Sequence, residues 1–388
     1  MNLQKRLLSL ISLTLAAACS SSQNAPTTTA PPPMTIGNYN SDAGSSPVGV
    51  IPVAALHDAQ RNKELELSIE YPTRGGPFPV IVFSHGYGSS DRGYEPLISY
   101  WTSYGYVCIR PSHADAGTMR DTLREALERR PQQQQRQRRT QSTSVQEQPR
   151  ERNTMEAIWD REREAQWRDR VLDVKLVLDS LDELERQFPE LRGKMDHSRI
   201  GVGGHSYGGF TTMLISGART FSSPPLSLPD PRVRAAVVMS PQGTAANRGL
   251  TEQSWTDVRI PVMYMTGSLD RGATESETPE WRKQAFEFSP AGDKYFVLIP
   301  GASHLSFTGG AGAIAFESTQ TSPYGYGQRG NYPQQNPQRS TYANRGPFNT
   351  IKITSLTFWD AYLKNDPGAR EVLTPEKLQA SGVTLQKK

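Results

Sequence analysis

IGVGGHSYGG, residues 200 to 209, joins an apolar run to a G-x-S-x-G pentapeptide. In this pattern the serine occupies a strained turn between a strand and a helix. The flanking glycines are needed because larger neighbours would collide with the adjoining backbone. The pattern therefore predicts that Ser206 is a nucleophile. The alternative is a glycine-rich loop in which the serine has no chemical role.

A serine hydroxyl becomes reactive when a histidine accepts its proton near neutral pH. The chain has six histidines, and His304 is the one that lies downstream of the pentapeptide. It follows the apolar run at residues 295–299, where a loop at the carboxyl edge of a parallel sheet would present it. His304 is therefore the predicted base. We expect His85 to support its own loop and to transfer no proton.

A carboxylate must hold the histidine in its reactive tautomer, and in this arrangement it comes between serine and histidine in chain order. The apolar run at residues 261–265 predicts a buried strand, and Asp270 follows in the turn after it. Asp270 is therefore the predicted acid, although such a residue can also serve only as a turn cap. Asp257 and Asp293 are poorer candidates because each precedes its strand.

The oxyanion formed by attack on a carbonyl group needs two backbone N–H donors. The amide of Tyr207, the residue after the nucleophile, is the first candidate. The second should come from the loop after an early strand, which we place at residues 80–84. That loop reads HGYG, residues 85–88, and its glycines allow a close backbone approach, so Tyr87 is the predicted second donor. An ordinary glycine-rich turn is the alternative.

The chain resembles the α/β-hydrolases of the group that contains platelet-activating-factor acetylhydrolase, chlorophyllase and dienelactone-hydrolase-like serine esterases. The matching stretches are DAQRNKELELSIEYP (58–72), PVIVFSHGYG (79–88), IGVGGHSYGG (200–209), SPQG (240–243), PVMYMTGSLD (261–270) and GASHLSF (301–307). The resemblance implies an α/β-hydrolase fold, with a mostly parallel central sheet and helices on both faces. The alternation of strand and helix patterns along the chain also argues for such a sheet.

The resemblance implies that the chain hydrolyses carboxylic esters. Dienelactone hydrolases use a cysteine nucleophile where this chain has Ser206, so a plain carboxylesterase is favoured over lactone opening, and the likeness to acetylhydrolases implies short acyl groups. The alternatives are a thioesterase or phospholipid acyl hydrolase with the same triad, and a surface binding protein on an inactive hydrolase scaffold. We expect no cofactor and no metal, since His113 and Asp115 offer only two potential ligands and no zinc spacing occurs.

The first 18 residues have a basic start, an apolar stretch and a small-residue end, which predicts a secretory signal peptide. Residues 16–19, AAAC, resemble a bacterial lipoprotein processing site, at which Cys19 would be lipidated. We therefore expect an exported protein attached to the outer membrane or cell envelope through Cys19. An ordinary cleaved signal is the alternative. Cys108, in an apolar strand, is predicted to be a core residue.

The remaining sequence predicts a disordered tether at residues 19–47 and one hydrolase domain at residues 48–388. Low-complexity insertions interrupt that domain at about 119–160 and 308–349. The first carries nine arginines against five acidic residues between positions 120 and 152, and we expect a solvated loop, with contact to an anionic surface as the alternative. The second follows His304 and could overhang the site.

The expected partners follow from these features. They are a small-molecule or lipid ester as substrate and a membrane reached through the lipid anchor. No nucleic-acid partner is expected, because no aromatic residue interleaves the arginines of the first insertion until Trp159. The sequence leaves the oligomeric state open.

Overall fold

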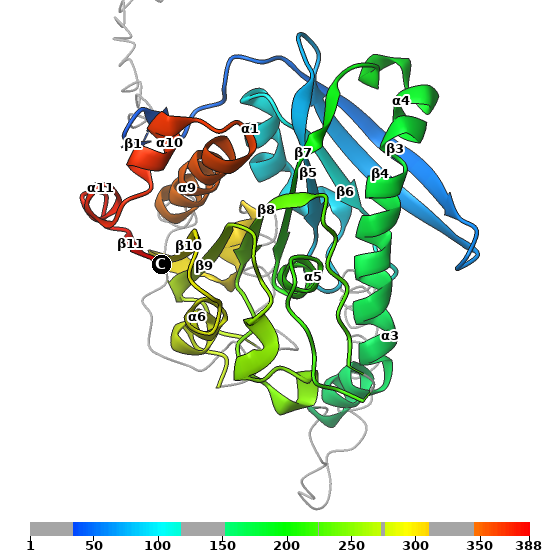
Figure 1. Cartoon of the computed structure of the whole chain (residues 1–388), viewed down its shortest axis with the longest axis vertical. Coiled ribbons are helices and arrows are strands. Elements are labelled where there is room, and N and C mark those ends of the chain that lie inside the picture. The colour runs from blue at the N-terminus through cyan, green and yellow to red at the C-terminus, as the bar shows by residue number, and fades with distance from the viewer. Residues whose placement is uncertain (1–33, 118–151, 224, 273–275, 310–344) are drawn as a thin grey trace, which may run out of the picture. The chain divides into compact units, whose positions relative to one another are not determined.

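A nine-stranded sheet lies at the centre of the described structure (Figure 1). The computed structural model describes residues 34–117, 152–223, 225–272, 276–309 and 345–388, which all fall within the unit Met34–Lys388. The strand order is β11-β10-β9-β8-β7-β5-β6-β4-β3. The strands are β3 (Val48–Asp58), β4 (Lys63–Pro72), β5 (Phe78–Ser84), β6 (Val107–Pro111), β7 (Met195–His205), β8 (Val233–Met239), β9 (Val262–Leu269), β10 (Lys294–Ser303) and β11 (Thr384–Lys387).

The six central strands, from β6 to β10 in the sheet order, pair in parallel. The outer strands β3, β4 and β11 pair antiparallel at the two edges. Helices cover both faces of the parallel part, so its strands are buried on both sides and their sequences are nearly continuous in apolar residues. The observed sheet confirms the predicted fold class.

Helices pack on both faces of this sheet and divide the core into two clusters. One cluster gathers side chains from α3, α5 and α6, and the other gathers side chains from α1 and the C-terminal helices. In α3, apolar residues recur at helical spacing at Trp167, Val171, Val174 and Leu178, and this stripe is buried in the first cluster. The helices are α1 (Glu95–Ser103), α3 (Arg152–Asp179), α4 (Leu181–Gln187), α5 (Tyr207–Ile215), α6 (Pro279–Glu287), α9 (Arg345–Leu363), α10 (Pro367–Val372) and α11 (Pro375–Gln379).

Ordered structure begins before the boundary expected at residue 48. β1 (Thr35–Ile36) and β2 (Tyr39–Asn40) form a small antiparallel hairpin, and Ile36 is buried in the second core cluster. Met34 and Tyr39 pack against the same cluster, so a few apolar residues within a polar stretch seat the segment, which a compositional argument does not detect. Residues 1–33, including Cys19, lie outside the described residues.

Both predicted insertions fall largely outside the described residues, which omit 118–151 and 310–344. The end of the first prediction needs correction, because α3 already begins at Arg152. The end of the second prediction needs correction as well, because α9 begins at Arg345. Residues 308 and 309, at the start of the second prediction, still belong to described structure.

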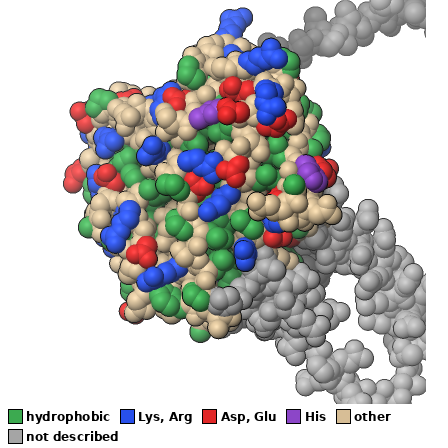
Figure 2. Space-filling model, turned by 45° about the vertical axis from the view of Figure 1, so that its right-hand side comes forward, with side chains coloured by type: hydrophobic (Ala, Val, Ile, Leu, Met, Phe, Trp, Pro, Cys, Tyr) green, Lys and Arg blue, Asp and Glu red, His purple; other side chains and the backbone are tan. Residues whose placement is uncertain are grey.

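On the face shown in Figure 2, Lys and Arg side chains are interspersed with Asp and Glu side chains. Within the part of the chain that the structure describes, no helix combines the length and apolar content needed to cross a bilayer.

The predicted catalytic and oxyanion residues all lie at one edge of the sheet. Ser206 follows β7, Asp270 follows β9, and His304 follows β10, while residues 85–88 follow β5. Because these strands are parallel, their carboxyl ends meet at the same edge, where ligands bind in open α/β sheets. The topology therefore brings together residues that are up to about 220 positions apart in the chain.

Candidate active site

Ser206 forms a sharp elbow between β7 and α5. Its backbone has φ 55° and ψ −114°, a conformation that costs energy in a residue with a side chain. The surrounding structure holds it there, since the Ser206 amide donates to Met239 O at 2.9 Å and its carbonyl accepts from the Phe210 amide at 3.0 Å. Strain of this kind is concentrated at functional sites.

The glycines beside Ser206 are required by close backbone contacts. A Cβ atom on Gly204 would lie 2.2 Å from Gly208 O, and a Cβ atom on Gly208 would lie 1.9 Å from Ser84 O. Both distances are far below van der Waals contact, so no other residue fits without movement of the backbone. The steric reason given above for the G-x-S-x-G pattern therefore holds in this chain.

His304 and Asp270 form a hydrogen-bonded pair. His304 begins the 3₁₀ turn η5 (His304–Thr308), and its Nδ1 lies 2.8 Å from Asp270 Oδ1. The Asp270 side chain is fully buried, whereas 21% of the His304 side chain is exposed. This geometry fits a carboxylate that receives the Nδ1–H of a neutral imidazole and leaves Nε2 as an acceptor.

Three further residues fix the Asp270 carboxylate. Ser240 Oγ and Thr266 Oγ1 donate to Oδ2 at 2.6 and 2.9 Å, and the Nε of Arg282 lies 3.1 Å from Oδ1. Burial raises the pKa of Asp270, but the charges of Arg282 and His304 and the hydrogen bonds from His304 and Ser240 outweigh burial, so the pKa lies below its usual value. Asp270 is therefore ionised at neutral pH.

The rejected acids lie elsewhere. Asp257 forms ion pairs with Arg219 at 3.4 Å and Arg259 at 3.9 Å, and Asp293 pairs with Lys387 at 3.4 Å. Half of the Asp257 side chain is exposed. Of the three carboxylates considered from sequence, Asp270 is the one that the fold brings to His304.

His205 packs against His304 with ring centroids 4.6 Å apart. The Nδ1 of His205 lies 2.8 Å from the Tyr94 hydroxyl, and burial together with the charge of His304 lowers the pKa of His205 well below its usual value. His205 is therefore neutral and serves as packing for the His304 ring.

The two predicted oxyanion residues lie side by side. Tyr207 is the first residue of α5, so its amide is at the helix N-terminus, and Tyr87 lies in the loop after β5. Their rings meet edge to face with centroids 5.8 Å apart. The elbow and the loop thus converge as the sequence pattern predicts, and the role of the two amides stays a prediction.

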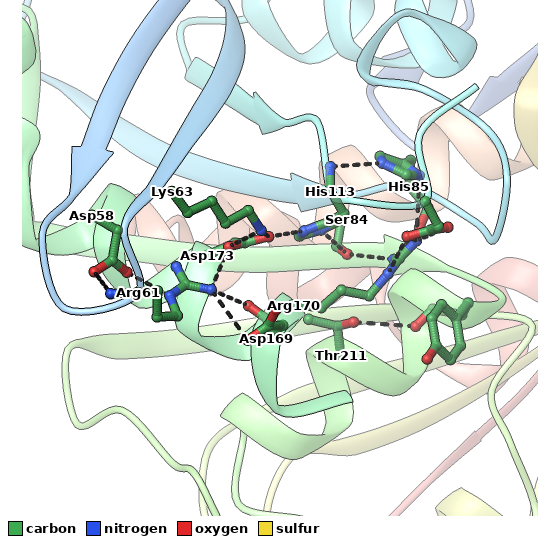
Figure 3. Close-up of polar contacts among 12 residues, drawn as sticks. Asp58, Arg61, Lys63, Ser84, His85, His113, Asp169, Arg170, Asp173 and Thr211 are labelled. Carbon is green, nitrogen blue, oxygen red and sulfur yellow. Dashed lines mark hydrogen bonds and ion pairs between the residues drawn. The ribbon is translucent and has the colours of Figure 1, made fainter. Parts of the chain in front are cut away.

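The loop at residues 85–88 rests on a buried polar network that sequence reasoning missed (Figure 3). His85 lies 2.7 Å from Gly86 O through Nδ1, and its Nε2 accepts from the His113 amide at 3.1 Å. Burial and the charge of Arg170 lower the pKa of His85 well below its usual value, so it is neutral. This geometry agrees with a supporting role for His85.

Ser84, His113 and Asp173 form a hydrogen-bonded Ser–His–Asp series that is separate from the predicted catalytic residues. Ser84 Oγ lies 2.8 Å from His113 Nε2, and His113 Nδ1 lies 2.8 Å from Asp173 Oδ2. All three side chains are fully buried, so no substrate reaches this serine. These hydrogen bonds therefore hold β5, α3 and the segment after β6 together.

Cys108 lies in the core, as its position in an apolar strand predicts. Cys108 is buried in β6, and burial raises the pKa of its thiol to about 12, which leaves it unreactive. Among the described residues, no group of three or more His, Cys, Asp or Glu side chains could hold a metal ion.

Comparisons with known proteins agree with the resemblance noted from sequence. Residues 56–240 match a family model described as platelet-activating factor acetylhydrolase, isoform II. Chlorophyllase-1 from Arabidopsis thaliana is 29% identical over 70 residues, which are 18% of this chain and 22% of that protein. The chain thus matches only 22% of the length of this curated relative. The predicted resemblance is confirmed.

The family match includes the elbow and the loop at residues 85–88 but ends at residue 240. Asp270 and His304 lie beyond it, so their assignment depends on the sequence pattern and on their geometry.

We predict that Gly208→Ala is strongly destabilising. The added methyl group must displace the Ser84 carbonyl or the start of α5, and overpacking of this kind costs about 1–3 kcal/mol. Urea unfolding measures the loss. Gly346→Ala is the control, because a Cβ atom there meets nothing within 4 Å and alanine suits a helix better than glycine. A Gly208→Ala variant as stable as the wild type would contradict the proposed constraint.

We also predict that Asp270→Asn lowers stability most at neutral pH. The folded-state pKa of Asp270 is depressed, so its ionised form contributes stability above the usual value of 3.8, and this contribution is lost as the pH falls below that value. The difference in free energy of unfolding between wild type and variant should therefore shrink as the pH falls from 4 towards 2. Urea titrations across this range measure it. A difference in the free energy of unfolding that stays constant or grows as the pH falls would contradict an ionised Asp270.

Proposed function

We propose that this α/β-hydrolase, which resembles the platelet-activating factor acetylhydrolases and chlorophyllase, is an exported serine carboxylic ester hydrolase that acts through an acyl-enzyme on Ser206. The observation that carries the proposal is the pairing of His304 with Asp270 at 2.8 Å, at the same sheet edge as the strained Ser206 elbow. Nucleophile, acid and base occur in the chain order expected for this fold.

In the first half of the reaction Ser206 Oγ attacks the ester carbonyl carbon while His304 Nε2 accepts the hydroxyl proton. The carbonyl oxygen becomes an oxyanion, which the amides of Tyr87 and Tyr207 stabilise. The tetrahedral intermediate then collapses. The bond from carbon to the alcohol oxygen breaks, and His304 returns its proton to that oxygen.

In the second half a water molecule attacks the acyl carbon and gives its proton to His304. Collapse of the second tetrahedral intermediate breaks the bond to Ser206 Oγ, which takes the proton back, and the carboxylic acid leaves. Asp270 stays ionised throughout and stabilises the imidazolium, because Arg282, Ser240 and Thr266 hold its charge and orientation.

The similarity to proteins whose names state acetylhydrolase and chlorophyllase activities supports an ester substrate. Resemblance to the acetylhydrolases favours short acyl groups.

Replacement of Ser206 by Ala tests the mechanism. Because the nucleophile and its base act as a unit, Ser206→Ala and His304→Ala should each reduce kcat for a p-nitrophenyl ester by up to about 10⁶-fold, with an unchanged circular dichroism spectrum. A panel of esters with acyl chains of increasing length should be cleaved fastest at two to four carbons. The matched control is His197→Ala, since His197 lies on the surface beside Asp182.

Turnover of Ser206→Ala above about a tenth of wild type would overturn the serine assignment. Wild-type protein that is folded yet cleaves no ester of the panel would favour the inactive-scaffold alternative. Preference for acyl thioesters or phospholipids would retain the triad and change the substrate.

The proposed export and anchoring depend on the N-terminal signal and on Cys19. We expect the mature protein to begin at Cys19 and to carry more than one acyl chain, because a single chain binds membranes only marginally. Mass spectrometry of the mature N-terminus measures this, and Cys19→Ala should remove membrane attachment while kcat stays unchanged. An unmodified first residue other than Cys19 would refute the anchor.

A further inference from the structure

Arg170 and Asp115 form a buried ion pair beneath the loop at residues 85–88. Arg170 comes from α3, and its Nε and Nη2 donate to Asp115 Oδ1 at 3.0 and 2.8 Å, while Nη2 also donates to Oδ2 at 2.7 Å. The side chains are only 2% and 6% exposed. Such a forked contact fixes the orientation of both groups.

The pair holds the loop on both sides of Tyr87. Arg170 Nη1 donates to His85 O at 2.7 Å, and Asp115 Oδ2 accepts from the Gly88 amide at 2.8 Å. Tyr87 therefore sits in a segment whose two ends are tied to the same ion pair. Burial raises the pKa of Asp115, but Arg170 outweighs burial and lowers it to about 2, so the carboxylate stays charged.

The same guanidinium also contacts the other predicted oxyanion residue. It lies over the Tyr207 ring, with Cζ 4.4 Å from the ring centroid. One side chain thus touches the loop that carries Tyr87 and the residue that opens α5. The relative position of the two predicted donors depends on where Arg170 lies.

The next turn of α3, after Arg170, is tied to the hairpin of β3 and β4. Asp173, three residues later and so on the same face, accepts hydrogen bonds from Arg61 Nη1 at 2.7 Å and from Lys63 Nζ at 2.8 and 2.9 Å. It also holds His113 at 2.8 Å, and His113 N in turn donates to His85. Figure 3 shows this network running from Asp58 on one side to the loop on the other.

We propose that Arg170, paired with Asp115, is a positioning residue that sets the geometry of the oxyanion site. The proposal depends on the serine mechanism proposed above. Arg170 touches no reacting atom. Its guanidinium contacts the carbonyl of His85, the carboxylate of Asp115 and the ring of Tyr207. These contacts hold the amides of Tyr87 and Tyr207 toward the same point before substrate arrives.

Loss of Arg170 should impair the transition state more than substrate binding. Oxyanion donors act on charge that develops during the reaction, and loss of one donor costs about 10²–10³ in kcat. A donor that is displaced should reduce kcat less than a donor that is removed. We therefore expect Arg170→Met to lower kcat about 10- to 100-fold and to leave KM within about threefold. Arg170→Lys keeps the charge without the fork and should fall between the wild type and Arg170→Met.

The experiment measures kcat and KM on a short p-nitrophenyl ester, the inhibition constant of a trifluoromethyl ketone, and the urea midpoint. The ketone adds to the serine as a tetrahedral oxyanion, so its affinity should weaken in parallel with kcat. Arg110→Met is the matched control, because Arg110 pairs with Glu70 at 2.8 Å and both side chains are as buried as Arg170 and Asp115. It should lose stability with kcat unchanged.

A kcat for Arg170→Met within threefold of wild type would overturn the inference, as would an equal loss of kcat in Arg110→Met. If Arg170→Met does not fold, Arg170→Lys and Asp115→Asn replace it, and wild-type kcat and ketone affinity in both overturn the inference. Ser206→Ala separates the two proposals. An inactive Ser206→Ala beside an active Arg170→Met rejects the positioning role alone, whereas an active Ser206→Ala rejects the serine mechanism.

Discussion

Helix α5 approaches the end of β5 more closely than any side chain at Gly208 would allow, and the candidate site depends on this approach. A Cβ atom at that position would lie 1.9 Å from the Ser84 carbonyl oxygen. The contact is possible because Ser206 turns the chain sharply and α5 starts at the next residue. The nucleophile and the amide of Tyr207 are thereby brought beside the loop that contains Tyr87. Fold and site are therefore set by the same backbone contact.

Two buried ion pairs hold parts of the candidate site in place. Arg282, from α6, lies 3.1 Å from Asp270, which holds His304, and Arg170, from α3, lies 2.7 Å from Asp115, which holds the loop at residues 85–88. Both helices pack on the same face of the sheet as α5. In each pair the arginine keeps the pKa of the carboxylate low, so that each carboxylate is a fixed negative charge at neutral pH. Charged groups that are fixed in this way need little reorganisation during a reaction.

The sequence was sufficient to predict the parallel sheet and the residues that gather at its edge. Apolar runs gave the strands, and parallel strands must present their carboxyl ends together, so Ser206, Asp270 and His304 could be named from chain order. The roles of Arg170 and Arg282 could not be predicted in this way. Each arginine lies within a helix whose sequence pattern shows only an amphipathic face, and its partners depend on how that helix packs on the sheet. Asp115 was noted in the sequence only as one of two potential metal ligands. Nothing in the sequence predicted its ion pair with Arg170, 55 positions later. The early hairpin was missed because Met34, Ile36 and Tyr39, which seat it on the core, are scattered through a polar stretch.

The claim at the centre of this account is that Ser206 forms a covalent acyl intermediate. Treatment of the wild-type protein with a fluorophosphonate, followed by proteolysis and peptide mass spectrometry, tests this claim most directly. The account predicts one adduct, on the peptide that contains Ser206, and predicts that a short ester present in excess slows its formation. An adduct on another serine, or a folded and ester-cleaving protein that forms no adduct, would contradict it.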